Sequence, residues 1–327
     1  MKIRKIIGLL ALAIVIISCN NEHSNKKDYS KYTAKPDYVL NPDAQFKTYF
    51  KAYDASLKLW GTPYEELYIP TSVGTAHVIV SGPKNGEPLV LLHGMNATST
   101  MWYPNAKAFS LDYRVYAIDF ILEPGKSLNT KTFDNVDEIA PWYYEIFDAL
   151  ELEKFSLMGA SKGGWLSVKI ALYNQDRIQK IVLLSPAQTF IWIRPSMDLL
   201  KNIITMFSSD DTKTTQTLKT MSSNVDNINK IYLEQFYQSH TKDSISKFIM
   251  AMQPFSKRDL QSLKMPVLVL IGDDDAINNS KTIKMANEIL PYGQGQIIKN
   301  AGHFLSIDQA DAVNQKTLNF LNIKNNK

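Results

Sequence analysis

A serine between two glycines lies near the middle of the chain. Residues 159–163 read Gly-Ala-Ser-Lys-Gly, the G-x-S-x-G pattern that presents a serine hydroxyl at a sharp turn between a strand and a helix. An apolar run precedes this turn, and residues 164–172 have the composition of a helix. The turn strains the serine backbone, and small neighbours are needed to avoid clashes. The pattern predicts that Ser161 is a nucleophile at the positive end of the following helix.

A serine hydroxyl is a weak nucleophile at neutral pH and needs a general base, which in turn needs an acid that orients it. With this type of turn, the chain order is serine, acid, histidine. Of the five histidines, only His240 and His303 follow Ser161. His303 lies in a glycine-containing loop after an apolar pair, whereas His240 lies in a polar helical stretch that is typical of a surface. We therefore expect His303 to be the base.

The acid is expected at the end of a strand between the serine and the histidine. Residues 266–271 are apolar and β-branched, as in a buried strand, and lead into Asp273, Asp274 and Asp275. Residue chemistry alone allows any of these three aspartates to orient the histidine. The other two are expected in a solvated loop, where their like charges partly repel.

Acyl transfer also requires N–H groups that bind the oxyanion, since the loss of one donor costs about 3 kcal/mol of transition-state stabilisation. One donor is the backbone N–H of the residue after the nucleophile, here Lys162. The other comes from the turn after an earlier strand, predicted at residues 88–92. The backbone N–H of Met95 is the predicted second donor. His93, in the same turn, is interpreted as a structural histidine that braces it.

Seven short segments carry a family resemblance: residues 91–94, 101–105, 116–119, 159–164, 184–187, 271–275 and 299–303. In sequence and order they are similar to the α/β-hydrolase superfamily, and most similar to its compact bacterial carboxylesterases. The resemblance covers residues 60–323. It implies a serine hydrolase that cleaves a carboxylic ester of a small or medium apolar substrate through an acyl-enzyme, with no cofactor. It also implies that Asp275 is the acid, because the family usually places it three residues beyond the glycine.

Two features depart from the family pattern. Many members carry D-x-x-G-x-G-x-S after the fourth strand, whereas residues 119–127 here read DFILEPGKS. Lys162 occupies a position at which several relatives carry an apolar or aromatic residue. Both departures concern the acyl pocket, and they leave the predicted triad of Ser161, Asp275 and His303 unchanged.

Other functions of the same fold are left open by these residues. Peptidases, thioesterases, lactonases and carbon–carbon bond hydrolases share the fold, and the pocket selects among them. A surface lipoprotein that keeps the fold only for binding is a further alternative, against which the complete predicted triad argues. An aspartate nucleophile would indicate a dehalogenase or an epoxide hydrolase, and Ser161 argues against both.

The elements that must position these residues alternate along the chain. Strands are predicted at residues 89–92, 114–118, 155–158, 180–184, 266–271 and 296–298, with helical stretches between them. This alternation is typical of a mostly parallel α/β sheet with helices on both faces. Residues 67–69 and 77–80 are predicted to form an antiparallel pair ahead of that sheet, after a helix around Phe50.

A long segment, residues 187–263, separates two predicted neighbouring strands. It contains no glycine, and Val225, Ile228 and Tyr232 recur at helical spacing. We interpret it as a helical cap that is inserted before the last two strands and covers the active site. Most of its apolar side chains are expected to pack against the core, and some are expected to line an acyl or alcohol pocket.

Composition allows one large domain and argues against several functions. The chain has 327 residues, of which 45% are hydrophobic, enough for a full-sized core. Residues 1–18 contain three basic and no acidic residues, so the net charge of +4 falls to +1 without them, and nucleic-acid binding is not indicated. No H-E-x-x-H pattern occurs, and residues 273–275 lack the spacing of a calcium loop, so no metal site is predicted.

The amino terminus has the pattern of a bacterial export signal. A basic start precedes an apolar stretch at residues 6–17 that is too short to span a bilayer comfortably. Cys19, the only cysteine, follows where a lipoprotein signal would be cleaved and the cysteine lipidated. We expect residues 1–18 to be a signal peptide, 19–45 a flexible tether and 46–327 the hydrolase domain. An uncleaved anchor is the alternative, and both place the domain at the membrane of the cell envelope, facing the periplasm or the exterior.

Overall fold

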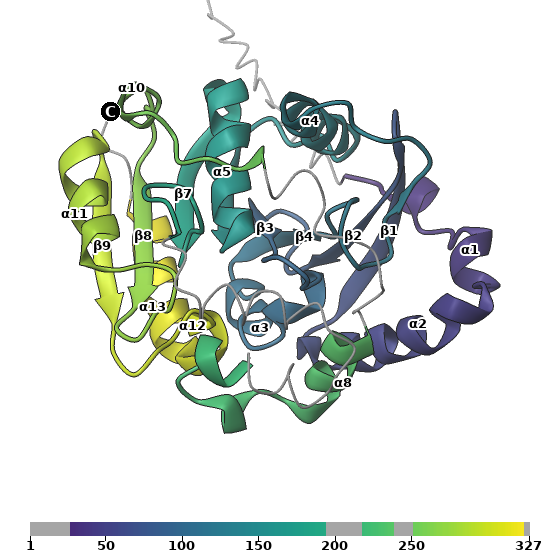
Figure 1. Ribbon diagram of the computed structural model, residues 1–327. Coiled ribbons are helices and arrows are strands. Elements are labelled where there is room, and N and C mark those ends of the chain that lie inside the picture. The colour runs from purple at the N-terminus through teal and green to yellow at the C-terminus, as the bar shows by residue number, and fades with distance from the viewer. Residues whose placement is uncertain (1–26, 194–217, 239–250, 324–327) are drawn as a thin grey trace, which may run out of the picture.

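A nine-stranded sheet forms the centre of the computed structural model, which describes residues 27–193, 218–238 and 251–323. The strands are β1 (Tyr64–Thr71), β2 (Gly74–Ser81), β3 (Glu87–Leu92), β4 (Tyr113–Ile118), β5 (Leu128–Asn129), β6 (Phe155–Ala160), β7 (Ile178–Leu184), β8 (Val267–Gly272) and β9 (Gly293–Ile298). Their order is β1-β2-β4-β3-β6-β7-β8-β9, and the short β5 pairs with β2. Figure 1 shows the sheet from β9 on the left to β1 on the right. Pairing is antiparallel at β1–β2, β2–β4 and β2–β5, and parallel from β4 through β9.

Helices cover both faces of this sheet. They are α1 (Asp37–Leu40), α2 (Ala44–Leu57), α3 (Ala106–Phe109), α4 (Ile139–Ala149), α5 (Lys162–Tyr173), α8 (Lys230–Gln238), α10 (Lys257–Gln261), α11 (Ser280–Ile289), α12 (Leu305–Asp308) and α13 (Ala310–Asn322). Successive side chains of a strand point to opposite faces. On β3, Val90 and Leu92 pack in the layer that contains α4, α5 and α11, whereas Leu89 and Leu91 pack in the layer of α2, α3 and α13. Both faces of the central strands are thus buried.

The structure confirms the predicted fold class, a mostly parallel sheet between two helical layers. Each predicted strand is present, and the antiparallel β1–β2 pair precedes the parallel strands as expected. The short β5 was not predicted, because two residues are too few for a periodic pattern.

The predicted cap lies between β7 and β8, and the structure describes it at residues 187–193, 218–238 and 251–263. There, α8 lies beside α2 (Figure 1). The Gln235 side chain of α8 donates to Thr98 Oγ1 at 2.9 Å and accepts from Thr100 Oγ1 at 2.6 Å. These buried hydrogen bonds attach the cap segment to the core. The division into core and cap stays a prediction, since the rest of the cap lies outside the described residues.

Within the predicted tether, which stays a prediction, Tyr29 packs on the domain. Tyr29 is 5% exposed, and its hydroxyl donates to the Leu150 carbonyl at 2.9 Å. The same hydroxyl lies 3.0 Å from the Tyr116 hydroxyl. The polar composition of this stretch favoured a tether, and it does not reveal that one aromatic ring is buried with its hydroxyl hydrogen-bonded. The predicted signal peptide and Cys19 lie outside the described residues.

In the part of the chain that the structure describes, no helix combines the length and apolar character needed to cross a bilayer.

Candidate active site

Ser161 occupies the sharp turn between β6 and α5, as the G-x-S-x-G pattern predicts. Its backbone has φ 53° and ψ −116°, a conformation that non-glycine residues rarely adopt. The Ser161 N–H donates to the Leu184 carbonyl at 2.8 Å, and its carbonyl accepts the Gly164 N–H at 3.0 Å. These hydrogen bonds hold the strained residue in place, so that its side chain has a defined position at the end of the parallel strands.

The two outer glycines of the pattern are explained by close backbone approach. A Cβ atom on Gly159 would lie 2.1 Å from the Gly163 carbonyl oxygen. A Cβ atom on Gly163 would lie 2.1 Å from the Leu92 carbonyl oxygen at the end of β3. Either distance is far inside van der Waals contact, so a larger residue would push α5 away from the strands and displace the serine.

His303 lies in the loop after β9 and contacts both predicted partners. Its Nε2 is 2.9 Å from Ser161 Oγ, and its Nδ1 is 3.0 Å from Asp275 Oδ1. The His303 side chain is 3% exposed. An ionised carboxylate only accepts hydrogen bonds, so Nδ1 carries a proton and Nε2 is left to accept the serine proton. The arrangement is suited to general-base activation of the serine.

Asp275 is the aspartate of the three that contacts His303. Its Oδ1 also accepts the N–H groups of Ile277 at 2.9 Å and Asn278 at 3.1 Å. Burial alone would raise the pKa of Asp275, but His303 and these N–H groups hold the pKa well below its usual value. The carboxylate therefore stays ionised beside the imidazole.

The other two aspartates have different partners. Asp273 Oδ1 accepts the Ala301 N–H at 3.2 Å, and its Oδ2 lies 3.6 Å from Lys299 Nζ. Asp274 accepts a hydrogen bond from Ser223 Oγ at 3.3 Å. Residue chemistry could not distinguish the three aspartates. The geometry of the turn after β8 places Asp275, rather than Asp273 or Asp274, against His303.

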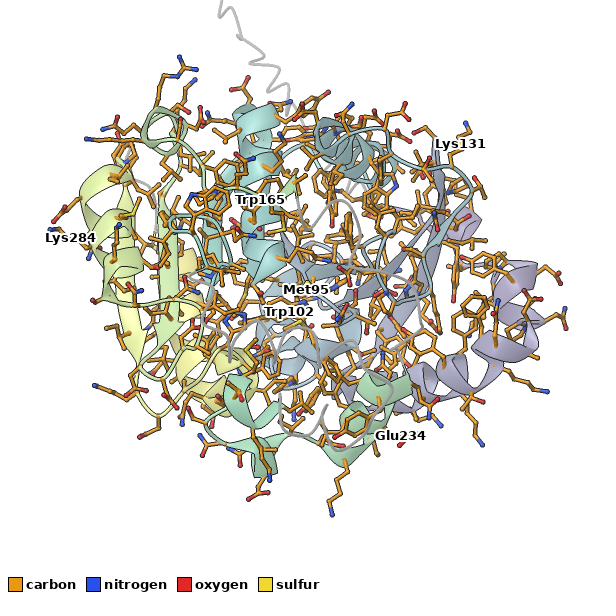
Figure 2. The ribbon with its side chains drawn as sticks, in the orientation of Figure 1. Met95, Trp102, Lys131, Trp165, Glu234 and Lys284 are labelled. Atoms are coloured by element: carbon orange, nitrogen blue, oxygen red, sulfur yellow. The ribbon has the colours of Figure 1, made fainter. Side chains whose placement is uncertain are left out.

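Met95 and Lys162, the predicted oxyanion-hole residues, line the same pocket as Ser161. The Lys162 N–H belongs to the first turn of α5, where N–H groups have no partner within the helix. Met95 follows β3, and a Cβ atom on the preceding Gly94 would lie 3.5 Å from Ser161 Cβ. Figure 2 shows Met95 and Trp102 near the middle of the molecule, while Lys131 and Lys284 lie at its rim.

The pocket at Ser161 is largely apolar. Side chains from the core and from the predicted cap contribute to it: Met95, Ala97, Met101, Leu218, Met221, Ile228, Tyr232, Phe236, Met252, Ile277, Phe304 and Ile307. None of the described residues that line it is an aspartate or a glutamate. Such a pocket favours an uncharged, apolar group next to the nucleophile.

Sequence reasoning missed Glu123, which pairs with the Lys162 side chain. Lys162 Nζ lies 3.0 Å from Glu123 Oε1, and both side chains are buried. Burial lowers the pKa of Lys162, and the Glu123 carboxylate opposes this effect. The sequence did hold a signal for this pair. Lys162 and the stretch 119–127, which contains Glu123, are the two departures from the family pattern, and their joint occurrence could have indicated a contact.

Sequence reasoning also missed Asp308, a 4% exposed residue of α12. Its Oδ2 accepts the Gly302 N–H at 2.8 Å and the Ser223 N–H at 3.0 Å, and its Oδ1 accepts from Ser222 Oγ. Asp308 thus joins the loop of His303 to a segment of the predicted cap. No local motif marks it, because two of its three partners, Ser222 and Ser223, are distant in sequence.

His93 has two hydrogen-bond partners, in agreement with the structural role predicted for it. Its Nδ1 donates to the Gly94 carbonyl at 2.8 Å, and its Nε2 accepts the Phe120 N–H at 2.9 Å. Burial and the nearby charge of Lys162 lower the pKa of His93 to about 4. The neutral ring therefore fixes the turn before Met95. His240 lies outside the described residues.

The fold and this site define the protein as an α/β-hydrolase of the serine hydrolase type. The family described as serine aminopeptidase, S33, matches residues 84–310, and the chain belongs to this family. The chain is 33% identical over 282 residues to carboxylesterase YbfK of Bacillus subtilis, across 84% of this chain and 93% of the relative.

A second Bacillus subtilis carboxylesterase, named nap, is 32% identical over 280 residues, across 84% of this chain and 92% of the relative. The crystal structure of naproxen esterase from Bacillus subtilis matches with a TM-score of 0.80 at 31% identity, over 86% of this chain and 99% of that one. The resemblance to α/β-hydrolases and to bacterial carboxylesterases is thereby confirmed.

Proposed function

We propose that the protein is a carboxylesterase in which Ser161 forms an acyl-enzyme with an uncharged, apolar ester. The observation that carries the proposal is the continuous contact from Ser161 Oγ through His303 to Asp275, at 2.9 and 3.0 Å. Homology to two carboxylesterases at about one third identity supports an ester as the substrate class.

In the first half of the reaction, Ser161 Oγ attacks the ester carbonyl carbon while its proton moves to His303 Nε2. The negative charge that develops on the carbonyl oxygen is bound by the N–H groups of Met95 and Lys162. The intermediate then collapses, the carbon–oxygen bond to the alcohol breaks, and His303 returns the proton to the leaving oxygen. Asp275 keeps the imidazole oriented and stabilises its protonated form.

In the second half, a water molecule takes the place of the serine hydroxyl. His303 removes a proton from this water, and the resulting hydroxide attacks the acyl carbon. Collapse of the second tetrahedral intermediate releases the carboxylic acid, and the proton on His303 restores the Ser161 hydroxyl. Ester and water are consumed, acid and alcohol are formed, and no other reactant is needed.

The pocket supports an ester over the free amino terminus of a peptide. An aminopeptidase must bind the ammonium group of its substrate, for which a carboxylate is the usual partner. The described pocket lining contains no carboxylate, and the Lys162 ammonium is paired with Glu123. An apolar acyl or alcohol group is the chemistry that fits these side chains.

A fluorophosphonate probe tests the proposal directly. We expect mass spectrometry to locate the adduct on Ser161 of the full chain, and Ser161→Ala to abolish both labelling and hydrolysis of p-nitrophenyl butyrate. Thermal stability of this variant should remain near that of the wild type, since the change removes one oxygen atom. Ester hydrolysis that survives in a folded Ser161→Ala protein would refute the mechanism.

We further propose that Cys19 carries a lipid that anchors the enzyme to the membrane of the bacterial cell envelope. The support is the basic start, the short apolar stretch and the single cysteine that follows it. Growth with radiolabelled palmitate should label the wild-type chain and leave Cys19→Ser unlabelled. Equal labelling of the two proteins would contradict the anchor.

A further inference from the structure

The two departures from the family pattern contact each other beside the nucleophile. Side-chain exposure is 2% for Lys162 and 4% for Glu123, and Nζ lies 3.0 Å from Oε1. The Phe120 ring lies against the same ammonium, with its centroid 4.3 Å from Nζ. A buried charge that loses its partner is costly, so each of these two side chains restricts the position of the other.

The Glu123 carboxylate has a second contact, on the other side of the predicted oxyanion hole. Its Oε2 accepts the N–H of Asn96 at 2.8 Å. Asn96 directly follows Met95 and has φ 54°, in the left-handed region that non-glycine residues seldom occupy. A hydrogen bond to an ionised acceptor is stronger than one to a neutral group, so the carboxylate stabilises this strained turn.

One carboxylate therefore connects the two segments that carry the predicted oxyanion donors. Lys162 supplies one donor from its backbone and reaches Glu123 through its side chain. Met95 supplies the other donor, and the residue after it is held by the same carboxylate. We propose that Glu123 and the Lys162 side chain are positioning residues that set the separation between the two N–H donors.

The inference rests on the proposed function, in which both N–H groups bind the oxyanion. Such donors act only when they lie about 2.7–3.1 Å from the oxyanion in the transition state, so a small change in their separation weakens transition-state binding. Substrate binding in the apolar pocket does not depend on that separation. A defect in positioning should therefore lower kcat and leave KM nearly unchanged.

Three variants of the full chain test the proposal: Glu123→Gln, Lys162→Met and the double variant Lys162→Met/Glu123→Gln. Each single change leaves one buried charge unpaired, whereas the double variant leaves none and keeps the test valid where a single variant does not fold. With p-nitrophenyl butyrate, we expect kcat to fall about 10- to 100-fold in all three. Lys162→Arg, which keeps the positive charge opposite Glu123, should lower kcat less than Lys162→Met does.

A second readout separates positioning from a general loss of structure. An alkyl trifluoromethyl ketone adds to the serine to form an oxyanion, so its affinity should fall in proportion to kcat. The pH dependence of kcat should keep its shape, because the contact between Ser161 and His303 is not altered. Lys169→Met is the matched control, since Lys169 lies on the same helix as Lys162. The change removes a surface ion pair between Lys169 and Asp137 and should change neither quantity.

Wild-type kcat and wild-type ketone affinity in the folded double variant would overturn the proposal. A higher KM with unchanged kcat would also overturn it, because the pair would then shape the pocket rather than the oxyanion hole. Fluorophosphonate labelling of the wild type distinguishes this failure from a failure of the proposed function. If only the positioning role is wrong, Ser161 is still labelled, whereas a protein without label or turnover would contradict both.

Discussion

The described part of the chain contains two histidine–aspartate pairs, and they differ in the group that contacts the second ring nitrogen. His303 Nδ1 is 3.0 Å from Asp275, and its Nε2 faces the hydroxyl of Ser161 at 2.9 Å. His77 Nδ1 is 2.8 Å from Asp119, but its Nε2 faces a second carboxylate, Glu66, at 3.2 Å.

The second carboxylate favours the protonated form of His77. Burial alone would lower the pKa of His77, but hydrogen bonds to Asp119 and Glu66 outweigh it and raise the pKa. Both ring nitrogens then donate, and none is available to accept a proton. His303 has one carboxylate and one hydroxyl, so its Nε2 can accept the proton of a nucleophile. A contact between an aspartate and a histidine is therefore not enough to make the histidine a general base. The group at its second ring nitrogen determines whether that nitrogen can accept a proton.

Asp275→Asn breaks the first pair and should have the largest effect. The amide can donate to Nδ1 and so favours the wrong tautomer of His303, as in the serine-protease precedent, where kcat drops about 10⁴-fold. Steady-state kinetics with p-nitrophenyl butyrate measures the loss. Asp273→Asn and Asp274→Asn are the controls, and an equal loss in either would show that the acid has been assigned wrongly.

His77→Gln breaks the second pair and should affect stability rather than catalysis. Removal of one partner from a buried charged pair typically costs about 3–5 kcal/mol in free energy of unfolding. Urea unfolding measures this difference, and kcat of the folded variant should stay near that of the wild type. The pKa of His77 is higher in the folded state than in the unfolded state. The contribution of His77 to the free energy of unfolding is therefore fully present below the unfolded pKa of about 6.5, and it is lost as pH rises through the folded pKa. A stability difference that grows with pH would contradict this charge state.

His93 extends the comparison to a histidine that is buried and neutral. Its folded-state pKa of about 4 lies below the unfolded value of about 6.5, so the unfolded chain binds its proton first as the pH falls. The resulting loss of unfolding free energy between pH 6.5 and 4 is about 3 kcal/mol. Urea unfolding of the wild type and of His93→Gln across this pH range measures how much of the loss is caused by His93. The same pH slope in both proteins would mean that other groups cause the loss.

Asp308→Asn tests the surroundings of the first pair. The change weakens the hydrogen bonds around the His303 loop but removes none of the contacts of His303 with Asp275 and Ser161. The change weakens the hydrogen bonds that hold Gly302, next to His303, to Ser222 and Ser223. A loss of one charge-assisted interaction of about 1.4 kcal/mol would lower kcat about tenfold. Stopped-flow or steady-state kinetics would detect it, and Asn314→Ala on α13 serves as a control for general packing. An unchanged kcat would assign Asp308 to the fold alone.

Periodicity and local motifs were sufficient for the sheet and for the choice of two residues, Ser161 and His303, that the structure brings into contact. Strands buried on both faces produce uninterrupted apolar runs, which is why residues 266–271 could be recognised from composition. Ser161 and His303 could be chosen because a strained turn needs small neighbours and because the chain order of such sites is restricted. The burial of Tyr29 was not predicted, because composition averages over a segment and does not register the burial of one ring.

The sequence by itself determined the order of strands and helices, the position of the nucleophile and the candidates for its partners, because these depend on local backbone sterics and on short-range hydrophobic patterns. Only the tertiary structure decided which aspartate faces His303, which histidine lies between two carboxylates, and that Glu123 lies between Lys162 and Asn96. Each of these depends on side chains that are far apart in the chain and meet where separate loops converge. Ionisation and hydrogen bonding there are set by distance and burial, and neither can be read from spacing along the chain.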